Sequence, residues 1–213
     1  MIAWLLCAAL ASAPVQPDAG APPPWKKVAD GRVQVFSRRA PGVRVAELKA
    51  QMIMAVTPLE VRAVLLDDDY TRHAPYVGEY TVVKTLKPNE WIHYTRLALP
   101  VVSDRDYYID ITRVRDLAPD GTGEYLATWV PWSAPQPEKD GVVRVTTNSG
   151  HWLVKATPDG AHAFVEYYLS FDSGGWLPAW VVNRGNKSVL PDVLGALEKE
   201  ALRRRAGRAE AKK

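Results

Sequence analysis

Apolar and polar positions alternate with a period of two along most of the chain beyond Trp25. This alternation is typical of β-strands that have one buried face and one face in water. Turn-forming segments such as Pro158-Asp159-Gly160 separate successive runs, so we predict hairpins and therefore an antiparallel sheet. The pattern predicts strands over residues 31–39, 43–56, 80–88, 90–99, 105–116, 123–131, 141–157 and 161–172.

Between the second and third strands the apolar spacing becomes helical, over residues 57–69. Thr57 is a residue type that caps helix starts, and Pro58 is suited to the first helical position. Glu60 completes a capping box with Thr57. The sequence therefore predicts a helix that begins at Pro58.

A second helical pattern follows the last strand and runs to Arg205. Pro191 lies inside it and cannot donate a backbone hydrogen bond, so we predict a kink or break there. Gly174 and Gly175 precede its apolar start, so we expect this helix to act as a hinged lid. Its apolar positions recur at helical spacing: Val182, Val189, Leu190, Val193, Leu194 and Leu197.

The first residues differ in composition from the rest of the chain. Residues 1–13 form a short apolar run that ends in small residues, which resembles a secretory signal, and no Lys or Arg precedes the run. Residues 14–24 are a spacer rich in Pro and Ala. We expect residues 25–205 to form one domain, residues 206–213 to be a basic tail, and the protein to be periplasmic or secreted.

The charge of the chain is concentrated at its C-terminal end. The formal net charge is +3, but residues 199–213 contain seven basic and two acidic residues, so the remainder is slightly acidic. This distribution does not favour nucleic-acid binding. The basic end is either a solvated, fraying terminus or a contact for anionic lipid headgroups.

Known catalytic and metal-binding patterns are missing from the sequence. The four histidines lie far apart, without a spacing typical of zinc sites. No glycine-rich phosphate loop precedes a helix, and no nucleophile elbow is found. We therefore expect neither a metal nor a cofactor.

The segment SDRDYYIDI places charges inside an apolar region. Arg105 and Asp106 have two interpretations: they meet a ligand in a cavity, or they tie a loop to the strand by an ion pair and by bonds to backbone carbonyls. Arg96 and Arg144 lie on other strands and are open to the same two interpretations. Alternation alone does not settle which face of the sheet these side chains occupy.

Four segments together resemble the START domain, a lipid-transfer fold of the helix-grip class: DGRVQVFSRRAPG, VVSDRDYYI, GVVRV with GHWLVKA, and LSFDSGGWLPAWVVNRG. The resemblance covers residues 25–205. It implies an α+β fold in which a curved antiparallel sheet wraps round a long C-terminal helix and encloses a hydrophobic tunnel. It also implies a tunnel mouth formed by Leu99, Pro100, Val101, Val102, Trp176, Leu177, Trp180, Val181 and Arg184.

The resemblance implies a monomeric carrier of one hydrophobic molecule, a lipid, fatty acid or sterol, with transient contact to a membrane surface. Some sterol-binding relatives bury a charged pair, and the matching positions here are taken as Ile92 and Ile111. Two alternatives stay open. One is a lipid-responsive sensor, and the other is a cyclase or hydrolase that uses polar groups such as His93, Arg96, Tyr108 or Asp110.

Overall fold

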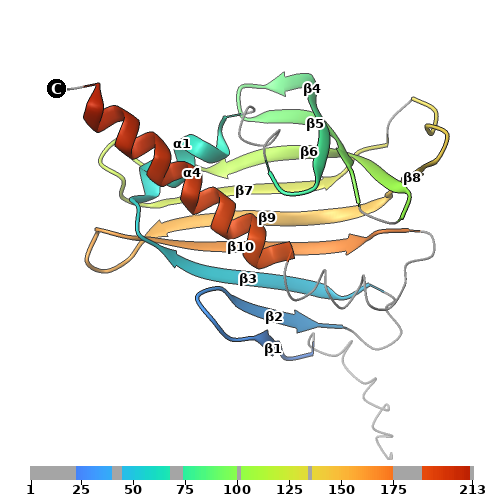
Figure 1. Ribbon diagram of the computed structural model, residues 1–213. Coiled ribbons are helices and arrows are strands. Elements are labelled where there is room, and N and C mark those ends of the chain that lie inside the picture. Colours follow the sequence, from blue (N-terminus) through green and yellow to red (C-terminus); the bar gives the residue numbers. More distant parts are fainter. Residues whose placement is uncertain are drawn as a thin grey trace, which may run out of the picture.

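The computed structural model describes residues 23–39, 45–67, 74–99, 102–133, 136–174 and 189–211. Figure 1 shows a large curved sheet with a long helix lying diagonally across one face. The helices of the described part are α1 (Pro58–Leu65) and α4 (Leu190–Glu210). The strands are β1 (Lys26–Ala29), β2 (Gln34–Arg38), β3 (Glu47–Met54), β4 (Val77–Lys87), β5 (Glu90–Leu97), β6 (Asp104–Arg115), β7 (Glu124–Pro131), β8 (Val142–Arg144), β9 (Thr147–Ala156) and β10 (Ala163–Asp172).

The predicted antiparallel sheet of hairpins is confirmed, with two exceptions. Nine of the ten strands follow the order β1-β2-β3-β10-β9-β7-β6-β5-β4, so β3 pairs with β10 across more than a hundred residues of chain. The predicted strand 141–157 is divided into β8 and β9, and β8 pairs with the start of β6 in parallel. Pairing within a hairpin follows from a local turn. The β3–β10 and β6–β8 pairings join strands that are distant in sequence, so they depend on the assembly of the whole sheet.

We call the face of the sheet that carries α4 the inner face. In the register, Met52 of β3 lies opposite Val165, Val165 opposite Val154, and Val154 opposite Tyr125 of β7. All four side chains are buried in the main hydrophobic core. Helix α4 covers this row with its own buried positions Leu190, Leu194, Leu197 and Ala201. Side chains alternate between the two faces along a strand, so this row shows for each of these strands which residues point to the inner face and which to the outer face.

The predicted capping box of α1 is confirmed. The Glu60 carboxylate accepts a hydrogen bond from the Thr57 backbone N–H at 2.9 Å, and the Thr57 hydroxyl accepts one from the Glu60 N–H at 3.4 Å. Glu60 also pairs with Arg205 and Arg208 of α4, and the Arg205 bond is the main reason why its pKa falls to about 2. The carboxylate that caps α1 therefore also holds α4 against it.

Within the described residues helix α4 begins at Leu190, and Pro191 lies at one of its first two positions, where proline is tolerated. At its other end the helix differs from the prediction. It continues to Glu210, so residues 206–210 of the predicted basic tail are helical. Arg208, the basic residue in this stretch, pairs with Glu60, and Arg204 just before it pairs with Asp67 and Glu200. Residues 175–188, the predicted start of this helix, lie outside the described residues.

Candidate functional site

The predicted tunnel mouth falls largely outside the described residues. Leu99 and Val102 are described and are half-buried. The remaining members lie outside the described residues, so their place at a mouth stays a prediction: Pro100, Val101, Trp176, Leu177, Trp180, Val181 and Arg184.

Of the four polar candidates, three lie on the outer face, opposite α4. Arg96 Nε donates to the carboxylate of Asp104 at 2.7 Å. Arg144 of β8 donates two hydrogen bonds to Asp106, at 2.7 and 3.1 Å, and Asp106 is fully buried. These pairs fix β8 and the end of β5 against β6, so the interpretation of Arg96, Asp106 and Arg144 as structural ion-pairing residues agrees with the geometry.

A small aromatic cluster accompanies the Asp106–Arg144 pair on the outer face. Tyr94 and Tyr108 pack together with ring centroids 4.8 Å apart, and the Arg144 guanidinium lies 5.1 Å from the Tyr108 ring. Ile92 belongs to this cluster, whereas Ile111 packs against the core under α4. The assignment of Ile92 and Ile111 to one charged-pair site inside a cavity is therefore wrong, because they lie on opposite faces.

The candidate site is the half of the inner face that lies beyond the start of α4, toward the ends of β5 and β10 and the start of β6 (Figure 1). We call it the distal inner face. Residues far apart in the sequence line it because seven strands contribute side chains to it. It consists of Leu48, Tyr80, His93, Thr95, Leu97, Arg105, Tyr107, Ile109, Trp129, Asn148, Trp152, Tyr167, Leu169 and Phe171.

An aromatic wall forms the β7, β9 and β10 side of the distal inner face. Tyr167 stacks on Trp152 with ring centroids 4.2 Å apart and on Trp129 at 5.7 Å. Gly150 makes this possible, since a Cβ there would lie only 2.4 Å from Cζ2 of Trp129. The indole therefore lies flat over Gly150, and its Nε1 donates to Oδ1 of Asn148 at 2.9 Å. The wall offers a broad apolar surface whose polar atoms are satisfied within the protein.

The β4 to β6 side of the distal inner face carries polar side chains, and His93 among them is uncharged at neutral pH. The Tyr80 hydroxyl is hydrogen-bonded to Nδ1 of His93, and burial lowers the pKa of His93 to about 4. The side chain of Tyr107 is within hydrogen-bonding range of Thr95 and Asn148, and burial raises the pKa of its phenol. These groups are uncharged at neutral pH, so they suit hydroxyl, ester or amide groups of a bound molecule.

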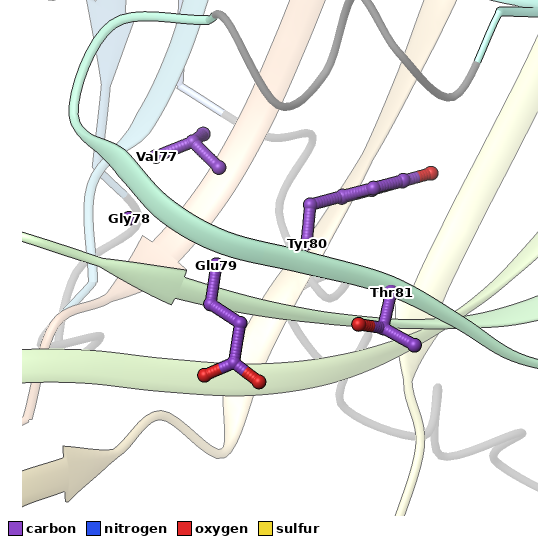
Figure 2. A pocket seen from close by; sticks show the side chains of 5 residues that line it. All are labelled: Val77, Gly78, Glu79, Tyr80 and Thr81. Atoms are coloured by element: carbon purple, nitrogen blue, oxygen red, sulfur yellow. The ribbon is translucent and has the colours of Figure 1, made fainter.

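A cleft of about 320 Å³ opens beside the edge strand β4. The described residues that line it are Val77, Gly78, Glu79, Tyr80 and Thr81. Figure 2 shows Val77 and Tyr80 projecting to one side of β4, while Glu79 and Thr81 project to the other. An irregularity in the pairing with β5 between Val77 and Glu79 accounts for the placement of Val77 and Tyr80 on one side. Tyr80 thus connects this cleft with the distal inner face.

Arg105 is the one polar candidate on the inner face. It lies opposite Leu97 in the register, and its side chain is 1% exposed. Its Nη1 donates to the backbone carbonyl of Ser103, as the loop-tying interpretation predicts. It forms no ion pair within the described part of the chain, and its Nε has no hydrogen-bond acceptor there. The ion pairs predicted around it are made by its neighbours Asp104 and Asp106.

The polar groups considered for an enzyme do not converge. Arg96, Tyr108 and Asp110 lie on the outer face, and of the four only His93 lies on the inner face. A catalytic pair built from these residues is therefore not formed in the described structure. No helix among the described residues is both long enough and apolar enough to cross a membrane.

Comparison with known proteins gives sequence relatives and structural neighbours. Mouse phosphatidylcholine transfer protein (Mus musculus) is 31% identical over 143 residues, which cover 65% of this chain and 64% of the relative. The corresponding rat protein (Rattus norvegicus) is 35% identical over 96 residues, which cover 44% of this chain and 43% of the relative. The match to each relative thus spans less than two thirds of that relative's length.

Two solved structures have the same fold. A STAR-related lipid transfer protein from Xanthomonas axonopodis superposes with a TM-score of 0.69 at 24% identity, covering 83% of this chain and 98% of that one. Human StAR-related lipid transfer protein 5 gives a TM-score of 0.70 at 18% identity, covering 85% and 88%. A family model, the START domain, matches residues 14–205. Because that match covers most of the chain, the protein belongs to the START domain family.

Proposed function

We propose that this protein binds one lipid molecule between the inner face of the sheet and the C-terminal helix, and carries it between membranes. The observation that supports the proposal is the distal inner face, where an aromatic wall stands opposite neutral polar groups beyond the start of α4. Lipid-binding family membership and relatives named for phosphatidylcholine transfer support the same choice of cargo. We propose that the protein does no covalent chemistry on this cargo.

We further propose that the C-terminal helix gates the site. Arg205 and Arg208 hold the far end of α4 to Glu60 of α1, so a swing of the helix would pivot about that end. Gly174 has a φ of +61°, a conformation that L side chains rarely adopt, at the end of β10. Pro191, at one of the first two positions of α4, adds a second place where a backbone N–H donor is missing. Both features favour movement at the end of the helix that faces the site.

Direct identification of the cargo tests the function. The full chain is purified without detergent and extracted with organic solvent, and the extract is analysed by mass spectrometry. Transfer of fluorescent phosphatidylcholine between donor and acceptor vesicles is then measured. We expect about one lipid per chain and transfer that rises in proportion to protein concentration. A protein that carries no lipid and accelerates no transfer would refute the proposal.

We also propose that residues 1–13 direct the protein out of the cytoplasm. The support is the apolar run followed by small residues at the start of the sequence. Fractionation of cells and N-terminal sequencing of the recovered protein test this. Recovery of the uncleaved chain from the cytoplasm alone would contradict it.

A further inference from the structure

Arg105 carries a charge on the distal inner face, whose other members are apolar or neutral. Its partner in the register is Leu97, and the next inner-face pair along the two strands is Thr95 opposite Tyr107. Residues two apart on one strand face are ~6.6 Å apart, so the guanidinium stem starts beside the hydroxyl groups of the distal inner face. Ile111, six residues further along β6, packs into the core under α4, which establishes that this face is the inner one.

The described structure provides no carboxylate for Arg105. All acidic side chains on β3 to β7, β9 and β10 have the parity of the outer face: Glu47, Glu79, Glu90, Asp104, Asp106, Asp110, Glu124, Glu166 and Asp172. On the described part of α4, the buried carboxylate is Glu198, which pairs with Arg32 and accepts from the backbone N–H of Ala55, beyond the end of β3. That position is at the opposite end of the inner face from Arg105.

A buried guanidinium with an unfilled donor is costly to maintain. Arg105 is 1% exposed, its Nη1 donates to Ser103, and its Nε has no acceptor within the described residues. Burial lowers the pKa of Arg105, and the nearby Asp104 opposes that effect only in part. The planar fork of a guanidinium matches the oxygens of a phosphate or carboxylate, which accept two N–H donors side by side.

We propose that Arg105 binds an anionic oxygen group of the lipid, a phosphodiester or a carboxylate, and so selects lipids that carry one. This inference rests on the proposed lipid-binding function and adds the class of lipid. Thr95 and Tyr107 lie beside that position and supply hydroxyl groups to the same headgroup, while the aromatic wall of Trp129, Tyr167 and Trp152 contacts the apolar chains. Sterols and neutral glycerides leave Arg105 unpaired and are therefore disfavoured.

A matched pair of lipids tests the inference. Dioleoylphosphatidylcholine and dioleoylglycerol have the same acyl chains and differ in the headgroup alone. The full chain is incubated with vesicles that contain both in equal amounts, re-isolated, and its bound lipids are quantified. We expect the phospholipid to be enriched about 10- to 100-fold, the factor associated with one charge-assisted hydrogen-bonded pair. Oleic acid replaces the phospholipid in a second arm, and cholesterol replaces the diacylglycerol in a third.

The variant Arg105→Met removes the guanidinium and its charge and keeps an unbranched apolar stem. We expect its enrichment to fall to near the vesicle composition, with total lipid per chain unchanged. Arg96→Met is the matched control, because Arg96 lies on the outer face of the adjacent strand and pairs with Asp104. It should keep the wild-type enrichment. Arg105→Lys keeps the charge without the fork and should retain an intermediate preference, and it serves as the test variant if Arg105→Met does not fold.

The outcomes separate this inference from the proposed function. No bound lipid of any kind would refute lipid carriage itself. Bound lipid without preference for the anionic group, or a preference that Arg105→Met and Arg105→Lys both retain, would overturn the role of Arg105 alone. Inorganic phosphate is added to the lipid-free protein in a last arm. If phosphate raises the melting temperature of the wild type but not of the variant, and no lipid preference exists, the site binds a free anion and the proposal is overturned.

Discussion

His93 makes the free energy of unfolding depend on pH between about 4 and 6.5, a range that lies above the ordinary pKa of most carboxylates. Its side chain is 6% exposed on the inner face and bonded to Tyr80, and the Trp91 ring lies 6.1 Å away. Burial lowers the pKa of His93 from 6.5 to about 4. In the unfolded chain the imidazole is in water and takes up a proton near its ordinary pKa. The stability of the protein is therefore compared at pH values on either side of the ordinary pKa of histidine.

The sign and size of the effect follow from proton linkage. Between the folded pKa and the unfolded pKa the unfolded state binds more protons, so the free energy of unfolding falls as the pH falls. The contribution of His93 is complete above about pH 7 and is lost as the pH falls toward 4. From about pH 7.5 to about pH 5, the two pKa values give a loss of ~2 kcal/mol.

Urea denaturation followed by tryptophan fluorescence measures this loss, with His93→Gln as the comparison. Glutamine keeps a hydrogen-bonding group beside Tyr80 and does not titrate. The wild type should lose ~2 kcal/mol more than the variant between the two pH values, because the contributions of the other groups cancel in the difference. Equal losses in the two proteins, within ~0.5 kcal/mol, would refute the reasoning that His93 is buried and neutral.

Two further predictions concern the packing of each face. Arg144→Met should destabilise the fold by ~3–5 kcal/mol in urea, because it leaves the buried carboxylate of Asp106 without its partner. The double variant Asp106→Asn/Arg144→Met should recover part of that loss, and no recovery would contradict the ion-pair explanation. Gly150→Ala should cost ~3 kcal/mol or more and shift the fluorescence of Trp129, because the new Cβ would lie 2.2 Å from the Tyr168 carbonyl oxygen and 2.4 Å from the Trp129 ring. Gly195→Ala on α4 is the control, because a Cβ at that position meets no other atom within 4 Å. It should raise the free energy of unfolding by ~1 kcal/mol.

Most of the secondary structure was predictable because its causes are local. The period of two marks the strands, and the Thr57–Glu60 capping box marks the start of α1, since both depend on neighbours in sequence. The short β8 was missed because no turn-forming Gly, Pro, Asn or Asp separates Arg144 from Thr147. The break becomes visible only when the Val145 N–H is seen to donate to the Asp106 carbonyl at 2.8 Å. A bond between residues 39 positions apart has no signature in a local pattern.

The site was less predictable because alternation gives the parity of a strand but not which parity faces inward. Strand β6 has buried apolar residues on both faces, with Tyr108 on the outer face and Ile109 on the inner face. The distribution of apolar residues therefore does not reveal which side of β6 faces α4. One signal was available: Arg105 and Asp106 are adjacent, so they point to opposite faces and cannot both line one cavity. Their separate roles needed Arg144, which reaches Asp106 from β8.

Two charged residues that are adjacent on β6, Arg105 and Asp106, differ in the partners that the described residues give them. On the outer face Asp106 is paired with Arg144, although the buried Oδ1 of Asp110 on the same face has no hydrogen-bond partner among the described residues. On the inner face Arg105 has a backbone carbonyl and an unfilled Nε, within the described residues. Under the proposed role of Arg105, this unfilled donor is available to an anionic headgroup that enters the site. The cost of the unfilled donor in the empty protein is then recovered as selectivity when an anionic headgroup binds.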